Sequence, residues 1–301
     1  MGIDYGGGMS LPAEVRRHAA EVVDRARFVT IDREALDALD VQDALDPIEP
    51  DPIRHYLDGE RADVADYVLT LNALNFGSGW FPTLRKRPRS SGYWTVAWGL
   101  ADRFRAEGPW SADELRRITG AELAAVLDQS PGHELIALYA EALRALGRWL
   151  GDRRAVDVID AANGSGARLA AAVVAGMPYY RDRGLYKRAQ ILAADVESFG
   201  VGTLRDLDEL TMFADNLVPH VLRCSGVLRY DDALAAQIDE GRLLPLHQAE
   251  HEIRCAGLHA VELLSARSGI PPRRLDAWLW HAGQDPEIKA RPRHRCRCVY
   301  Y

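Results

Sequence analysis

The chain has 301 residues, of which 48% are hydrophobic and 27% charged, and its formal net charge is -7. This length suits one large domain or two small ones with a substantial core. Because a grip on long DNA or RNA requires clustered positive charge, the negative balance disfavours such a partner. No apolar run approaches the ~20 residues that span a bilayer, and the first residues do not resemble a secretion signal. We therefore expect a cytoplasmic, monomeric protein without a membrane partner that acts on a small molecule.

The periodicity of the chain is mostly that of helices. We expect a flexible leader at residues 1–12 and one domain at residues 13–301, mainly α with few or no strands. The predicted helices are Pro12–Phe28, Ala62–Leu74, Trp94–Arg105, Ser111–Arg117, Glu134–Leu150, Asp157–Ala162 and Gly166–Gly176. Short helices with Gly or Pro stops are predicted from Leu204 to Trp280, and Arg295–Tyr301 is one of the few strand candidates.

Two helix starts carry recognisable caps. Asp32 follows Val29-Thr-Ile31 and is a plausible cap for the helix that includes Leu36. Ser111 is followed three residues later by Glu114, which is the spacing of a capping box. These signals fix where two helices should begin.

Cysteines and histidines are residues of this chain that could bind a metal such as zinc. The four cysteines form no CxxC pair, which favours a reduced setting. Four side chains recur every four residues on one predicted helix, a spacing that can bring imidazoles onto one metal: His247, His251, Cys255 and His259. They lack the HExxH order and an apparent third ligand, so we expect no metal and no organic cofactor.

The segment Tyr186-Lys-Arg-Ala-Gln-Ile-Leu-Ala-Ala-Asp195 is the most informative stretch. At ~100° per residue, Leu192 lies on an apolar face, whereas Lys187, Gln190 and Asp195 lie on the other side. An ordinary amphipathic helix with a solvated polar face has the same pattern. The interpretation as a pocket wall rests on the segments that accompany it.

Those segments occur in a fixed order along nearly the whole chain, about residues 13–301. They are His55, Asn72–Phe76, Gly92–Trp94, Met177–Asp182, Tyr186–Ile191, Leu210–Pro219, Glu252–Arg254, Ala260–Glu262, Leu275–Trp280 and His294–Tyr301. In that order they resemble the queuosine salvage family. The resemblance implies an all-helical body related in shape to helical DNA glycosylases. It also implies hydrolysis of the N-glycosidic bond of queuosine 5'-phosphate, which yields queuine and ribose 5-phosphate.

Such hydrolysis passes through a ribosyl cation, so the site needs a carboxylate near the anomeric carbon and a water. Asp215 is the best candidate, because its apolar context would strengthen its attraction for developing positive charge. A helix cap is the alternative at that position. Asp195 is the second candidate, for the water or a ribose hydroxyl, although it could instead pair with Arg188.

The remaining candidates would bind substrate. Lys187 suits the 5'-phosphate, and Gln190 can offer a donor and an acceptor to a base edge; a surface position is the alternative for each. A large deazaguanine calls for aromatic walls and polar contacts to its edge. The candidate walls are Phe76, Phe213 and Trp280, and the candidate edge readers are Asn75, His55 and Asp276, of which Asp276 and Trp280 share a helix face. Without the resemblance, all three aromatics would be assigned to the core.

Two stretches depart from the family pattern. Asn75-Phe-Gly-Ser-Gly-Trp-Phe81 interrupts an aromatic run, and Asp215-Asn-Leu217 lacks a tyrosine and an arginine found in relatives. Two other functions therefore stay open. One is a non-catalytic binder of the modified base or nucleoside. The other is a glycosylase for a base flipped out of DNA, which the missing basic surface disfavours.

Overall fold

The computed structural model describes residues 9–41 and 49–301. Its helices are α1 (Leu11–Val23), α2 (Arg33–Asp37), α3 (Arg61–Ala73), α4 (Gly92–Glu107), α5 (Ala112–Arg117), α6 (Gly120–Val126), α7 (Glu134–Leu150), α8 (Ala155–Ala161), α9 (Gly166–Gly176), α10 (Lys187–Ser198), α11 (Val218–Cys224), α12 (Asp232–Asp239), α13 (Gln248–Ser268), α14 (Pro272–Ala282) and α15 (Pro286–Ala290). Two short strands, β1 (Val29–Ile31) and β2 (Leu228–Tyr230), pair antiparallel with Thr30 opposite Arg229. The mainly α class is confirmed.

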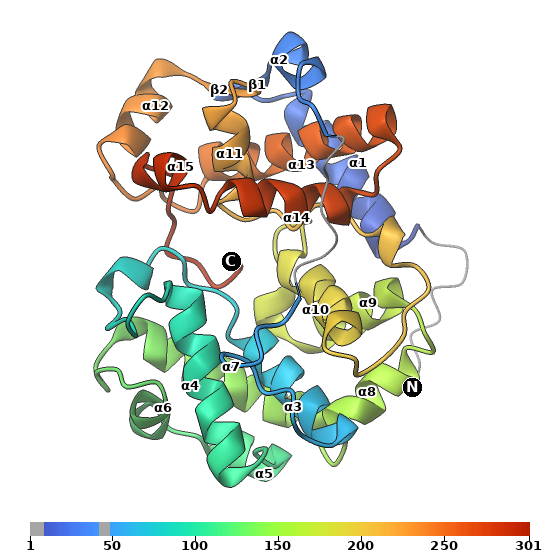
Figure 1. Cartoon of the computed structure of the whole chain (residues 1–301), viewed down its shortest axis with the longest axis vertical. Coiled ribbons are helices and arrows are strands. Elements are labelled where there is room, and N and C mark those ends of the chain that lie inside the picture. Colours follow the sequence, from blue (N-terminus) through green and yellow to red (C-terminus); the bar gives the residue numbers. More distant parts are fainter. Residues whose placement is uncertain (1–8, 42–48) are drawn as a thin grey trace.

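Two hydrophobic clusters lie one above the other (Figure 1). The lower cluster is built from α3 to α10, and the upper one from α1, α11, α13 and α14. Two of the places where the chain passes between the clusters are close to α10: Leu185 belongs to the upper cluster and Ala189 to the lower one, and Leu210 to the lower and Met212 to the upper. Both crossings flank α10, so this helix and the segment after it lie where the two clusters meet.

Most predicted boundaries agree with the structure to within a few residues. Glu134–Leu150 and Gly166–Gly176 are reproduced as α7 and α9. Asp32 caps α2 by accepting the Ala35 amide, and the capping box at Ser111 is present in full. The first helix begins at Leu11, two residues before the predicted start of the domain. Residues 1–8 of the predicted leader lie outside the described residues.

The prediction of short helices through Trp280 was wrong for α13, which runs without a break over 21 residues. Its side chains are buried on several faces because α1, α11, α14 and β1 all pack against it. A helix covered on several sides carries buried residues all round, so its sequence lacks the single apolar stripe that marks an amphipathic helix. Within the described residues, no helix is long and apolar enough to cross a membrane.

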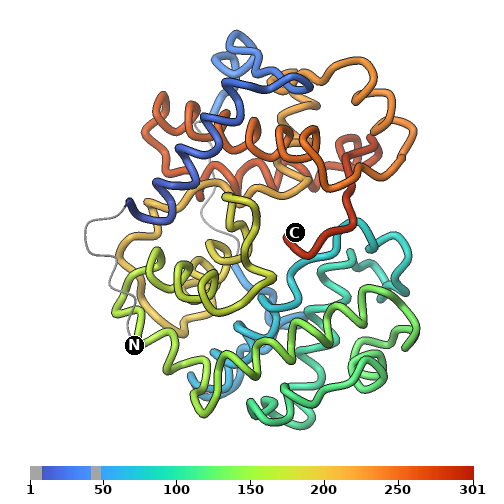
Figure 2. The backbone as a smooth tube through the Cα atoms, turned by 180° about the vertical axis from the view of Figure 1, so that it is seen from behind, coloured from blue at the N-terminus to red at the C-terminus, as the bar shows by residue number. Residues whose placement is uncertain are grey.

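The strand candidate Arg295–Tyr301 forms no strand and is part of an extended final segment, residues 291–301. This final segment leaves α15 and passes between the two clusters, where both views place its end (Figures 1 and 2). The Gly77 and Ser78 amides donate to the carbonyl oxygen of Tyr301 at 2.8 and 3.3 Å. A Cβ atom at Gly79 would lie 2.3 Å from the carbonyl oxygen of Cys296. The glycines that depart from the family pattern therefore admit this segment against the lower cluster.

Candidate active site

The start of α10 is held by a buried ion pair. Asp182 accepts the Lys187 amide at 3.2 Å. Its two carboxylate oxygens also accept from the Arg254 guanidinium at 2.8 and 2.6 Å, and both side chains are buried. A bidentate pair fixes orientation as well as distance. Asp182 thus ties the first turn of α10 to the middle of α13.

Lys187 is the first residue of α10, and its side chain is buried. Burial lowers the pKa of Lys187, and the negative charge of Asp215 opposes that shift. The Lys187 charge also lowers the pKa values of Asp195 and Asp276 against the effect of their burial. The lysine therefore lies within electrostatic reach of four carboxylates, Asp182, Asp195, Asp215 and Asp276.

Asp195 lies two turns further along α10 and keeps partial exposure. Burial raises its pKa to about 7, while Lys187 and the Asn72 side chain oppose the rise. A carboxyl group with that pKa can accept or give a proton near neutral pH. Arg188 is not its partner, since the guanidinium donates to the carbonyl groups of Asn72, Ala73, Tyr179 and Val299 instead.

The segment 211–217, which carries Asp215, is held by hydrogen bonds to several other elements. The Thr211 amide donates to Gln190 Oε1 at 2.9 Å. The Phe213 amide donates to Asp276 Oδ1 at 3.0 Å, and the Ala214 carbonyl accepts from Arg254 Nε at 2.8 Å. Two residues later, the Asn216 side chain donates to the His294 carbonyl at 3.1 Å. Helices α10, α13 and α14 and the final segment therefore all anchor this non-helical stretch.

The Asp215 carboxylate is oriented through one oxygen. Its Oδ1 accepts the amides of Leu217 at 2.7 Å and Val218 at 3.4 Å, which closes a turn just before α11. The N-cap residue of α11 is Leu217, so Asp215 is not itself the helix cap. In the described part of the chain, Oδ2 makes no hydrogen bond, and the residue is partly exposed. One oxygen therefore orients the group, and the other remains available to a ligand.

Asp276 lies on α14 and is buried. Burial raises the pKa of Asp276 well above its ordinary value, and the nearby Asp215 charge raises it further. Two like charges at short range favour protonation of one of them. Burial and the neighbouring Asp215 charge therefore both disfavour the ionised form of the Asp276 carboxyl group.

Of the other predicted residues, His55 lies in an aromatic cluster with Tyr67, Tyr93, Trp94 and Phe199. Its Nδ1 accepts the Asp51 amide at 3.0 Å, and its Nε2 is 3.1 Å from the Tyr93 hydroxyl. Burial lowers the pKa of His55 to about 4, so the ring is neutral and its proton is on Nε2. His55 therefore donates to Tyr93 and leaves the tyrosine proton for another acceptor. Burial raises the pKa of Tyr93, and the Asp195 charge raises it further.

Gln190 and Phe76 make internal contacts. The Gln190 amide nitrogen donates to Leu185 and Thr211, and its oxygen also binds Thr211, so it holds the segment 211–217. Phe76 is buried and stacks on the Arg188 guanidinium at 4.8 Å. Asn75, Phe213 and Trp280 are partly exposed. Sequence reasoning gave no role to Asp182 and Arg254, because their pairing across 72 residues has no local signature.

Fold and site together define a mainly α protein in which a buried lysine interacts electrostatically with Asp195, Asp215 and Asp276. The family model described as "Queuosine salvage protein" matches residues 55–301. The chain belongs to the queuosine salvage family.

Relatives named queuosine 5'-phosphate N-glycosylase/hydrolase match along much of the chain. The protein of Sphaerobacter thermophilus is 33% identical over 93% of this chain and 95% of its own length. The one from Nematostella vectensis is 30% identical over 78% of this chain and 81% of its own. The mouse protein, Mus musculus, is 34% identical over 46% and 48%.

Proposed function

We propose that this protein is an N-glycosyl hydrolase that cleaves queuosine 5'-phosphate to queuine and ribose 5-phosphate. The observation that carries the proposal is the set of three carboxylates, Asp195, Asp215 and Asp276, whose charges interact with that of the buried Lys187. Glycoside hydrolysis requires a group that stabilises the sugar cation, a base for water and an acid for the leaving group. The relatives named for this activity support the choice of substrate.

The three carboxylates have different environments and therefore suit different tasks. Asp215, oriented by two backbone amides, faces the anomeric carbon and stabilises the developing positive charge. Asp195 takes a proton from water as the water oxygen bonds to that carbon. Asp276 gives its proton to the base nitrogen as the glycosidic bond breaks, so that queuine leaves neutral. Lys187 balances the charges of the group.

Lys187 was also predicted to contact the 5'-phosphate. The carboxylates that interact with Lys187 are an alternative partner for its positive charge. Contact between Lys187 and the 5'-phosphate therefore stays a prediction that is separate from the catalytic assignment. Asn75, Phe213 and Trp280, which keep partial exposure, are the proposed contacts for the base. We further propose that residues 13–301 act as one unit, as a cytoplasmic monomer; the four cysteines, free in the structure, fit a reducing compartment.

The test is incubation of the purified protein with queuosine 5'-phosphate and, in parallel, with queuosine, while free base is followed by chromatography. We expect queuine from the phosphate form and much less from the nucleoside. Binding of both compounds without release of base would contradict the proposal and indicate a binding protein. Equal release from both would keep the hydrolase and remove the need for a phosphate contact.

A further inference from the structure

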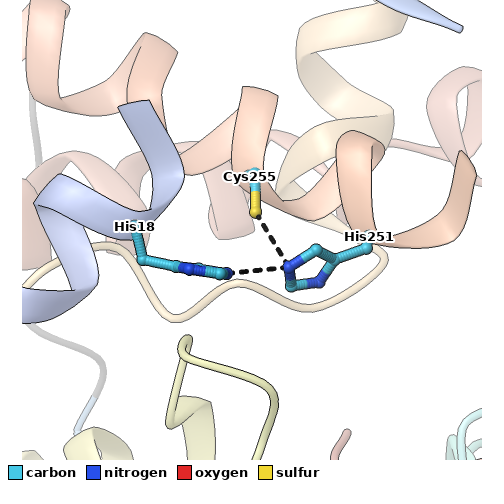
Figure 3. A group of neighbouring side chains, drawn as sticks. All are labelled: His18, His251 and Cys255. Carbon is cyan, nitrogen blue, oxygen red and sulfur yellow. Dashed lines mark hydrogen bonds between the residues drawn. The ribbon is translucent and has the colours of Figure 1, made fainter. Parts of the chain in front are cut away.

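Three possible metal ligands meet away from the carboxylates, between α1 and α13. They are His18 on α1, and His251 and Cys255 on α13 (Figure 3). Their ligand atoms all lie within 4.8 Å of one another. Because His251 and Cys255 are four residues apart on one helix, their side chains share a face, and α1 packs against that helix. Only the fold brings His18 to them.

The distances match those between ligands of one ion. Nε2 of His18 is 2.9 Å from Nε2 of His251, and Sγ of Cys255 is 3.6 Å from the same nitrogen. Zinc bonds of about 2.0 Å to nitrogen and 2.3 Å to sulfur imply tetrahedral edges of roughly 3.4 Å for N···N and 3.6 Å for N···S. The N···S edge already has that length, and the two rings need to separate by about half an ångström.

Burial and local packing hold the ligands in place. His251 and Cys255 are buried, whereas His18 keeps partial exposure, so a fourth position near it can take a water. Gly184 has φ +87°, and a Cβ atom there would lie 2.7 Å from the His18 ring. The turn before α10 therefore passes directly over His18 and restricts its ring.

Local charges do not prevent cation binding. Arg183 and Arg254 lie close to His251, but Arg183 pairs with Glu250 at 3.3 Å, and Arg254 pairs with Asp182 at 2.6 Å. Glu21 and Asp182 add negative charge on the side of His18, where Arg17 and Arg183 oppose them. Cys255 binds a metal as the thiolate, which adds one negative charge as its proton passes to solvent.

We propose that His18, His251 and Cys255 hold one divalent zinc-class metal ion that fastens α1 to α13. Imidazole nitrogen and thiolate sulfur are both ligand types that zinc binds, and a water would complete the tetrahedron. The expectation of no metal came from one helix alone. In the structure His247 precedes α13 and is exposed, and His259 is absent from the cluster, so His18 supplies the ligand that the helix lacks.

The experiment measures metal uptake by the full chain stripped with a chelator. Zn²⁺ is titrated against a chromophoric competitor, and Co²⁺ binding is followed for a thiolate-to-cobalt charge-transfer band. We expect one ion per chain and a visible band. The Cys255→Ser variant should lose the band, and His18→Asn should weaken Zn²⁺ binding by about tenfold or more.

His247→Asn is the matched control, because it removes an exposed histidine next to the same helix and should change neither result. Circular dichroism checks that each variant is folded. Two results would overturn the proposal: a wild-type protein that binds less than one Zn²⁺ per chain, or a His18→Asn variant that binds Zn²⁺ as tightly as wild type. The contact between His18 and His251 would then be only a hydrogen bond between two imidazoles. Base release is followed separately, so failure of the metal site and failure of the hydrolase assignment are distinguishable.

Discussion

At the scale of single residues, the raised pKa of Asp195 leads to a pH dependence. If this carboxylate accepts the proton of water, only its ionised form is active, so the rate of base release should rise with pH through about 7. The Asp195→Asn variant should be slow and should lose that rise. Initial rates between about pH 5.5 and 8.5 under saturating substrate provide the measurement. A wild-type profile that is flat across this range would contradict the role.

The raised pKa of Asp195 should also make the stability of the folded chain depend on pH. The pKa of Asp195 is higher in the folded chain than in the unfolded one, so the folded state binds the proton more tightly. This contribution is complete below the unfolded pKa of about 4 and is lost as pH rises through about 7. The Tm of Asp195→Asn minus the Tm of wild type should therefore increase as the pH rises from 5 to 8. A difference in Tm that does not change with pH would show that the carboxyl is not strongly shifted.

Asp215 provides the sharpest test of catalysis. Asparagine keeps a side-chain oxygen for the Leu217 and Val218 amides but removes the charge, so Asp215→Asn should fold normally. We expect kcat to fall by about a hundredfold or more, which is the usual effect of removing a stabilising group. Asp152→Asn, which changes an exposed aspartate, is the control. Full activity in a folded Asp215→Asn protein would remove Asp215 from the mechanism.

The element scale shows what the sequence could and could not predict. Helices with one apolar stripe, such as α7, were predicted to the residue, whereas α13 was missed because it is buried on several faces. Lys187, Asp215 and Asp276 were candidates from the sequence because each lies in a matched motif, and Asp195 was a candidate because it lies on the polar side of the same predicted helix as Lys187. The supporting roles of Gln190 and Arg254 follow only from contacts between distant elements.

The ion pair that joins α10 to α13 should be costly to break. Arg254→Leu leaves the Asp182 carboxylate buried and without its bidentate partner, so the free energy of unfolding should fall by about 3–5 kcal/mol. Arg242→Leu breaks the exposed pair with Glu240 and should cost less than about 1 kcal/mol. Urea denaturation of both variants makes the comparison. Similar losses in the two would contradict a special role for the buried pair.

At the scale of the whole molecule, the candidate active site depends on the final segment, residues 291–301, which is distant from Asp215 in the sequence. The stretch 291–301 passes between the two clusters, and its His294 carbonyl holds Asn216, the neighbour of Asp215. Gly77 and Ser78, on the lower side, bind the carbonyl of Tyr301. Because this segment connects the lower cluster to the loop of Asp215, its position should influence catalysis without any contact to substrate.

Gly79→Ala tests that coupling. The added Cβ atom would lie 2.3 Å from the Cys296 carbonyl oxygen, and backbone on both sides cannot yield cheaply, so the final segment must shift. We expect a loss of about 1–3 kcal/mol in unfolding free energy, typical of overpacking, together with a lower kcat. Gly120→Ala is the matched control, because a Cβ there meets no atom within 4 Å. If Gly79→Ala lost stability but kept full kcat, the segment would support the fold alone, and the loop of Asp215 would hold its geometry through α10, α13 and α14.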